Sequence, residues 1–183
     1  MTKGRSLERC REALEAGLTE LGENRVQEAV PKLDALPDVR WHLVGHLQRN
    51  KVRLAAGRFV LIQSVDSEPL AEEIAKRAPG QQVLLEVNAA REEQKHGCPP
   101  EQAVHVAASL AQLLPLQGLM CIGPLGRDPR PAFEELRRLR DDAEQYLGGA
   151  LPVLSMGMTD DFEAAVAAGS SMLRLGRLLF EPH

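Results

Sequence analysis

The sequence predicts an α/β protein built on a parallel β-sheet, and two observations lead to this fold class. Short runs rich in Val, Ile and Leu alternate along the chain with longer segments whose apolar residues recur at helical spacing. Many of the short runs are apolar throughout, which is typical of strands covered by helices on both faces. Seven such runs lie at residues 21–23, 41–45, 59–65, 82–88, 116–123, 152–157 and 171–176.

Two architectures agree with seven strands of this kind: a (β/α)8 TIM barrel that lacks one strand, and an open doubly wound sheet. No G-x-G-x-x-G motif follows an early strand, which removes the main signature of a dinucleotide-binding open sheet. A complete barrel usually takes about 250 residues, so a barrel of 183 residues would be compact. No linker, repeat or low-complexity segment divides the chain, and residues 1–183 are expected to form one domain.

Between the strands, helices are indicated by apolar residues spaced three and four apart. This pattern occurs at residues 26–33, 103–114 and 162–169. Pro31 lies inside the first of these segments and should kink or restart that helix, because proline lacks the N–H group that a helix interior needs. Ser67 is a suitable N-cap for the helix that follows it, and Gly57 is a suitable helix end.

Composition and charge limit the class of protein. A formal charge of -4, without a dominant basic block, argues against nucleic-acid binding. Cys10, Cys98 and Cys121 are widely spaced and form no C-x-x-C pair, which fits a reducing cytosol better than a disulfide framework or a zinc site. No apolar run approaches the roughly 20 residues that cross a bilayer, and the first residues do not resemble a signal peptide. We therefore expect a cytoplasmic protein without a membrane segment.

Polar and small residues gather where the predicted strands end. In a parallel sheet the carboxyl ends of the strands meet at one rim, and functional groups concentrate there. These strand ends carry Glu23, Asn24, Gly45, His46, Ser64, Asp66, Asn88, Gly123, residues 155–158 and residues 174–177. Because several independent strands contribute to this rim, it is the predicted functional site.

The last two strand ends can form a cup for a phosphate group. Barrels often bind phosphate at this position, and Gly157 and Gly176 would let backbone amides approach an anion. Ser155 adds a hydroxyl group to the first of the two turns. Asp160 and Asp161 begin the next helix and would repel a phosphate, so the anion is expected over the Ser155 turn, away from them. A capped strand-to-helix connection is the alternative explanation of this turn.

The sequence indicates no metal site. His42 and His46 lie four residues apart, but half of that span is strand, so their rings do not share a helix face and a structural role is expected. Residues 95–100 contain a histidine and a cysteine without further ligands at metal spacing, and we interpret them as a loop before a helix that begins with proline. The G-x-S-x-G motif of an activated serine is absent.

Longer blocks of the sequence resemble the pyridoxal phosphate homeostasis protein family, single-domain relatives of the alanine racemase N-terminal barrel. The blocks are "ELGENRVQEAVPKL" at 20–33, "WHLVGHLQRNK" at 41–51, "SVDS" at 64–67, "GLMCIGP" at 118–124, "LSMGMTDDF" at 154–162 and "LRLG" at 173–176. They follow the family order over essentially the whole chain. The resemblance implies an α/β barrel like the alanine racemase N-terminal domain, with pyridoxal 5'-phosphate (PLP) as its cofactor.

The resemblance also implies the residues of the cofactor site. In the family a lysine at the end of the first strand carries PLP as a Schiff base, and "TKGRS" at 2–6 matches that context, so Lys3 would be the covalent site. Arg174 matches an arginine that faces the pyridine nitrogen and, because it holds its proton, keeps that nitrogen unprotonated. Asn24 would lie beside the cofactor. The phosphate would be held by Ser155 and by backbone amides around Met156, Gly157, Gly176 and Arg177.

Two departures from the family pattern are visible. Lys3 stands almost at the start of this chain, whereas the family has about one helix and most of one strand before the lysine. The barrel is therefore expected to lack its first helix and most of its first strand, which leaves neighbouring strand edges unpaired. Arg177 stands where many relatives have threonine, so a cationic group would replace one hydroxyl at the phosphate.

The function implied by the resemblance is PLP binding in the service of intracellular PLP homeostasis, with little or no catalysis. The partners would be PLP and apo PLP-dependent enzymes, and the chain would be a monomer. A PLP-dependent amino-acid racemase is the alternative, but it needs acid/base groups on both faces of the substrate carbon, and Tyr146 lies in a charged helix away from the rim. A third interpretation is a barrel lyase or isomerase of phosphorylated sugars, in which Lys3 has no role.

Overall fold

The computed structural model describes residues 1–181 and contains a six-stranded parallel sheet. The strands lie in chain order from β1 to β6, and each neighbouring pair is parallel. Their bounds are β1 Glu20–Glu23, β2 Arg40–Leu43, β3 Leu61–Val65, β4 Val83–Glu86, β5 Leu116–Met120 and β6 Val153–Ser155. The predicted α/β fold with a parallel sheet is confirmed; the last two residues of the predicted domain lie outside the described residues.

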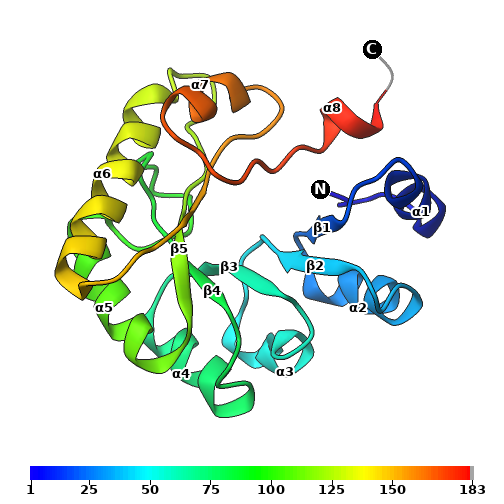
Figure 1. Cartoon of the computed structure of the whole chain (residues 1–183), viewed down its shortest axis with the longest axis horizontal. Helices are drawn as coiled ribbons and strands as arrows, with labels where there is room; N and C mark the ends of the chain where they lie inside the picture. Colours follow the sequence, from blue (N-terminus) through cyan, green and yellow to red (C-terminus); the bar gives the residue numbers. More distant parts are fainter. Residues whose placement is uncertain (182–183) are drawn as a thin grey trace.

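The order of the strands decides between the two predicted architectures. A doubly wound sheet reverses its strand order at a switch point, whereas here every strand pairs with the one that precedes it in the chain. The helices lie around the outside of a curved sheet (Figure 1). Winding in one direction with helices outside is the arrangement of α/β barrels, and β1 and β6 are the two edges of the sheet.

Within the described residues, one helix precedes β1, five connect the strands and two follow β6. Their bounds are α1 Leu7–Glu15, α2 Val26–Ala35, α3 Val52–Ala55, α4 Glu68–Arg77, α5 Ala103–Leu113, α6 Arg130–Leu147, α7 Phe162–Ala167 and α8 Arg177–Phe180, with single 3-10 turns at Arg49–Lys51 and Pro100–Gln102. The helices predicted from periodicity are confirmed as α2, α5 and α7. Ser67 occupies the N-cap position of α4, as predicted, but its hydroxyl donates to Asp66 and makes no capping hydrogen bond to the helix. Gly57 follows α3 with a φ of 76°, as predicted.

The structure differs from the sequence-based expectations at two places. Helix α2 runs through Pro31 without a restart, because buried residues before and after the proline (Val26, Ala29 and Leu33) hold both parts on the same core. Residues 171–176 form no seventh strand; a single bridge pairs Met172 with Ser155. The backbone N–H of Arg174 also donates to the carbonyl of Gly157 at 2.9 Å, but Gly157, with a φ of 98°, turns the chain and the pairing forms no regular ladder.

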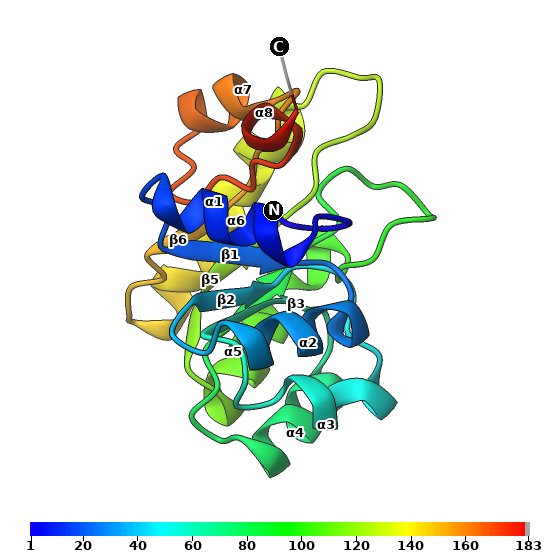
Figure 2. The same cartoon turned by 90° about the vertical axis from the view of Figure 1, so that its right-hand side faces the viewer.

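The residues before α1 lie between the two edges of the sheet. The backbone N–H of Thr2 donates to the carbonyl of Gly22 in β1 at 2.9 Å. The backbone nitrogen of Met1 donates to the carbonyl of Leu175 at 2.5 Å. The first residues therefore contact both β1 and the segment after β6, and Figure 2 shows this end of the chain beside β1 and α1.

The strands place alternate side chains in two environments. Trp41 and Leu43 of β2 belong to the main apolar core that the helices cover. His42, between them, lies on the other face, where its ring contacts Gln63 of β3. A smaller apolar cluster consists of Leu61, Leu84 and Met120. The inner face of the sheet thus combines apolar and polar side chains, and the polar ones lead toward the strand ends.

No helix within residues 1–181 is both long and apolar enough to cross a membrane. Cys10, Cys98 and Cys121 are buried free thiols. Burial raises the pKa of Cys98 and of Cys121 to about 12, so both remain protonated near neutral pH.

Candidate functional site

A cavity of about 780 Å³ opens at the carboxyl ends of the strands. Its walls come from the first residues of the chain and from the segments that follow β1, β2, β4, β5 and β6. Five of the predicted site residues line it: Lys3, Asn24, Arg174, Gly176 and Arg177. The structure therefore brings together residues from the two ends of the chain at the predicted rim.

Lys3 is exposed and lines the cavity from the segment before α1. The position of its backbone is fixed by Thr2, whose hydroxyl donates to Glu23 at 2.6 Å and whose carbonyl accepts from Lys32 at 2.9 Å. Gly4 follows with a φ of 69°, a left-handed conformation that favours glycine and turns the chain toward α1. A buried contact thus anchors the backbone at the residue before Lys3, which itself lines the cavity.

Asn24 follows β1 and offers an unsatisfied polar atom. Its Oδ1 is buried and has no hydrogen-bond partner within residues 1–181. Its backbone lies so close to Gly45 that a Cβ at that glycine would be 2.1 Å from the Asn24 carbonyl oxygen. Glycine is therefore required there, and the ends of β1 and β2 stay close together. Leaving a buried amide oxygen unpaired costs free energy, so this atom is available to accept a hydrogen bond from a bound group.

Arg174 is the buried cation of the cavity wall. Its guanidinium donates to the hydroxyl of Ser155 and to the carbonyl of Cys121, both at 2.7 Å. The residue is 5% exposed, and this burial lowers its pKa, an effect that the charges of Glu86 and Asp161 oppose. Two fixed acceptors therefore hold the guanidinium in one orientation.

Ser155, Met156 and Gly157 lie beneath the cavity and are not among the residues that line it. Ser155 is fully buried, and its hydroxyl donates to Gln63 Oε1 at 2.7 Å. A Cβ on Gly157 would lie 2.6 Å from the Cβ of Ala165 in α7. Packing against α7 and a positive φ explain this glycine without an anion. The structure thus places these three residues deeper than the phosphate cup expected from the sequence.

Thr159 lines the cavity but was not among the predicted site residues. Its Oγ1 accepts from the backbone N–H of Leu178 at 3.3 Å, which joins the turn after β6 to the start of α8. Arg177 forms an ion pair with Asp160, so the carboxylate expected to repel a phosphate is neutralised from α8. The sequence feature that could have identified Thr159 is its hydroxyl group, two residues after Gly157 in the turn that follows Ser155.

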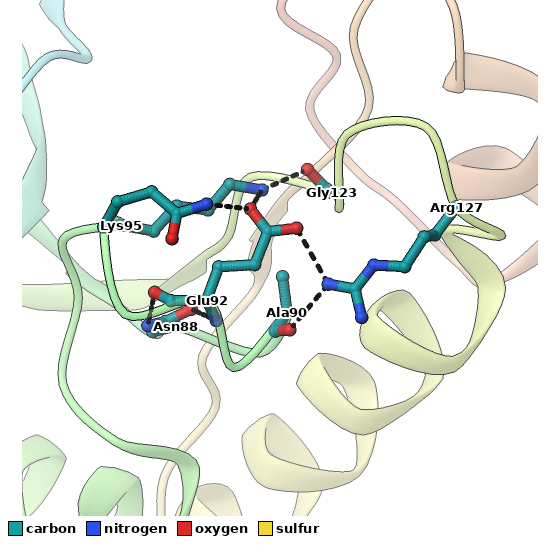
Figure 3. Close-up of polar contacts among 7 residues, drawn as sticks. Asn88, Ala90, Glu92, Lys95, Gly123 and Arg127 are labelled. Carbon is teal, nitrogen blue, oxygen red and sulfur yellow. Dashed lines mark hydrogen bonds and ion pairs between the residues drawn. The ribbon is translucent and has the colours of Figure 1, made fainter.

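Two loops meet at one side of the cavity, and a carboxylate joins them (Figure 3). Glu92, in the loop after β4, lies 2.9 Å from Lys95 and 2.8 Å from Arg127 of the loop after β5. Lys95 also donates to the carbonyl of Gly123 at 2.7 Å, and Arg127 to that of Ala90 at 3.4 Å. Lys95, Gly123 and Arg127 line the cavity, so this network sets the position of one wall.

His42 has the structural role that its context predicted. Its ring nitrogen Nδ1 lies 3.1 Å from Gln63 Nε2, and burial lowers its pKa. Gln63 accepts from Ser155, which in turn accepts from Arg174. A chain of hydrogen bonds therefore crosses the inner face of the sheet from β2 to the cavity wall.

The fold and the site define a class of α/β domain. The family described as "Alanine racemase, N-terminal domain" matches residues 2–182 of the chain. The alanine racemase of Clostridium difficile 630 in complex with cycloserine shares the fold, with a TM-score of 0.84 at 13% identity, over 100% of this chain and 54% of that structure.

More similar relatives specify the family. A "Pyridoxal phosphate homeostasis protein" of Aquifex aeolicus is 45% identical over 181 residues, which span 93% of this chain and 79% of the relative. The structure of PipY of Synechococcus elongatus with PLP bound has a TM-score of 0.88 at 36% identity and covers 98% of this chain and 89% of that structure. The chain belongs to the pyridoxal phosphate homeostasis protein family.

Proposed function

We propose that this protein binds PLP covalently through Lys3 and serves PLP homeostasis with little or no catalysis. The observation that carries the proposal is the convergence of Lys3, Asn24 and Arg174 on one cavity. Family membership supports it, because PipY, at 36% identity, was solved with PLP bound. PLP supplies an aldehyde that forms a Schiff base with a lysine amine, with loss of water.

The residues of the cavity fit the chemical groups of PLP. Lys3 offers the amine. Arg174 is held by Ser155 in an orientation from which it can face the pyridine nitrogen, and a guanidinium that keeps its proton leaves that nitrogen unprotonated. The unpaired Oδ1 of Asn24 can accept a hydrogen bond from the phenol group of the cofactor.

For the phosphate we propose the end of the cavity formed by Thr159, Gly176 and Arg177. The threonine hydroxyl, the glycine backbone and the guanidinium provide neutral and cationic donors. Ser155, which the sequence suggested as a phosphate ligand, would act on the cofactor through Arg174 instead. Met156 and Gly157 would shape the turn beneath the site.

The same site would also allow PLP to be released to other proteins. The exposed Lys3 lies in a cavity that opens at the strand ends, where a bound cofactor would be accessible to water and amines. We propose that the protein acts in the cytoplasm as a monomer and transfers PLP to apo PLP-dependent enzymes. Residues 1–183 would form one domain with the fold of an α/β barrel.

No observation favours the racemase alternative. Tyr146 is the one tyrosine of the sequence, it is 69% exposed near the end of α6, and it is not among the cavity residues. Tyr146 therefore does not provide a catalytic group opposite Lys3.

The test is an absorption spectrum of the purified protein after PLP is added and the excess is removed. A retained Schiff-base band is expected, and borohydride reduction followed by peptide mass mapping should place the adduct on Lys3. Lys3→Ala should lose the band and the adduct, while Lys76→Ala, an exposed lysine of α4, should keep both. A band that survives in Lys3→Ala would contradict the proposed covalent site.

A further inference from the structure

His46, Asp66 and His96 form a cluster at the ends of three neighbouring strands. His46 follows β2, Asp66 follows β3, and His96 lies in the loop after β4. One potential ligand atom from each residue lies within 4.8 Å of the others, and His46 Nδ1 is 3.6 Å from Asp66 Oδ2. Spacing along the sequence cannot reveal this cluster, because its members come from three separate segments.

A buried carboxyl group without a partner lies beside the cluster. Glu86, at the end of β4, lines a cavity of about 160 Å³ together with His46 and His96. It is 4% exposed, and its Oε2 has no hydrogen-bond partner among residues 1–181. Burial of an unpaired carboxyl oxygen costs free energy, so the group indicates a missing partner such as a cation or a water bound to a cation.

Within the described part of the chain, no lysine or arginine forms an ion pair with Glu86 or Asp66. The positive charge of Arg174 acts on Glu86, but its guanidinium donates hydrogen bonds to the hydroxyl of Ser155 and the carbonyl of Cys121. Lys95 lines the same cavity, but its amine bonds to another carboxylate and to a carbonyl.

The donor set is the one that zinc and related ions prefer. Two imidazoles and one carboxylate leave a fourth position open for water. The hydroxyl of Ser67 donates to Asp66 Oδ1 at 2.9 Å and leaves Oδ2 on the side of His46.

We propose that His46, Asp66 and His96 bind a divalent transition-metal ion, with Glu86 accepting a hydrogen bond from a water in the fourth position. The two imidazole rings now stack with centroids 3.8 Å apart and planes 9° from parallel. A nitrogen lone pair lies in the plane of its ring, so the rings must tilt apart to share an ion. His96 is exposed on a loop and has room to turn.

Zinc binding is the test, measured on tag-free, PLP-free protein by competition with a chromophoric chelator. One Zn²⁺ per chain is expected. His96→Ala and Asp66→Asn should each weaken binding at least about tenfold, and Glu86→Gln by about tenfold because the amide lacks the negative charge of the carboxylate. His105→Ala, an exposed histidine of α5, is the matched control and should bind as the wild type does.

Co²⁺ in place of Zn²⁺ identifies the ligands. Nitrogen and oxygen ligands give weak visible bands, whereas an intense near-ultraviolet band would indicate a thiolate, such as that of Cys98, and would overturn the proposal. Absence of Zn²⁺ binding by the wild type, or unchanged binding in the His96 and Asp66 variants, would also overturn it. Lys3→Ala should keep the zinc site while it loses PLP, which separates this site from the cofactor site.

Discussion

The ammonium group of Lys32 lies 2.6 Å from a carboxylate oxygen of Glu23, whose side chain is fully buried at the end of β1. The same oxygen accepts the hydroxyl of Thr2 at 2.6 Å. The sheet edge, helix α2 and the residue before Lys3 are therefore joined by one buried charge pair.

Lys32→Met should lower the free energy of unfolding by about 3 kcal/mol or more, because it leaves the Glu23 carboxylate buried without a counter-charge. Urea denaturation measures this loss. Lys76→Met, at an exposed position of α4, is the control and should change stability by no more than about 0.5 kcal/mol. Equal losses in the two variants would show that the pair does not support the fold.

Ser155→Ala should separate a positioning role of this serine from direct phosphate binding. Loss of the hydroxyl leaves a guanidinium N–H of Arg174 unpaired, which should cost about 1–3 kcal/mol of stability. PLP should bind more weakly, and the pH dependence of its visible band should change, while inorganic phosphate competes with PLP as in the wild type. Weaker phosphate competition would favour direct contact. Ser109→Ala on α5 is the matched control.

Glu86→Gln should change how stability depends on pH. Burial raises the pKa of Glu86 from its ordinary 4.5 to about 7, so the folded state binds more protons than the unfolded state between these values. Below pH 4.5, this difference in pKa contributes about 3 kcal/mol to the free energy of unfolding. The contribution is lost as the pH rises to about 7.

The glutamine variant should therefore be more stable than the wild type near pH 8 and similar to it near pH 4. Urea denaturation at both pH values, with a chelator present to remove metal ions, measures the difference. An unchanged gap between the two proteins across this range would rule out a protonated Glu86 in the folded state.

Glu92→Gln should loosen the loop after β4 without unfolding the protein. The variant weakens the contacts of Glu92 with Arg127 and Lys95, which hold the pKa of this carboxyl below its ordinary value. Release of PLP should become about two- to fivefold faster, since these ion pairs are near the surface. The rate of backbone amide hydrogen exchange at residues 88–98 should increase as well. Glu93→Gln, exposed in the same loop, should leave both unchanged.

The strands could be predicted because a strand that is buried on both faces is apolar at most of its positions, which is visible in the local sequence. Each of β1 to β6 overlaps a predicted apolar run. Residues 171–176 show the same composition but form no strand, because the turn at Gly157 redirects the backbone and only one bridge to Met172 remains. The composition of residues 171–176 does not indicate that the backbone changes direction before them.

Seven residues of the predicted rim line the cavity, namely Asn24, Gly45, Gly123, Met158, Arg174, Gly176 and Arg177. The rim did not, however, give the depth of each side chain. Ser155 belongs to the rim by sequence but is buried and bonded to Gln63 and Arg174. Thr159, a few residues later in the same turn, reaches the cavity instead. Which hydroxyl faces the cavity depends on how the turn packs against α7.

Local patterns in this chain were sufficient to specify a parallel α/β fold, its family and the rim where a ligand would bind. The assembled fold alone decides that Lys32 meets Glu23 and that His46, Asp66 and His96 lie together. The reason is physical. Apolar periodicity and strand burial repeat every few residues along the chain, whereas contacts between loops depend on the twist and register of the whole sheet, which bring distant segments to the same rim.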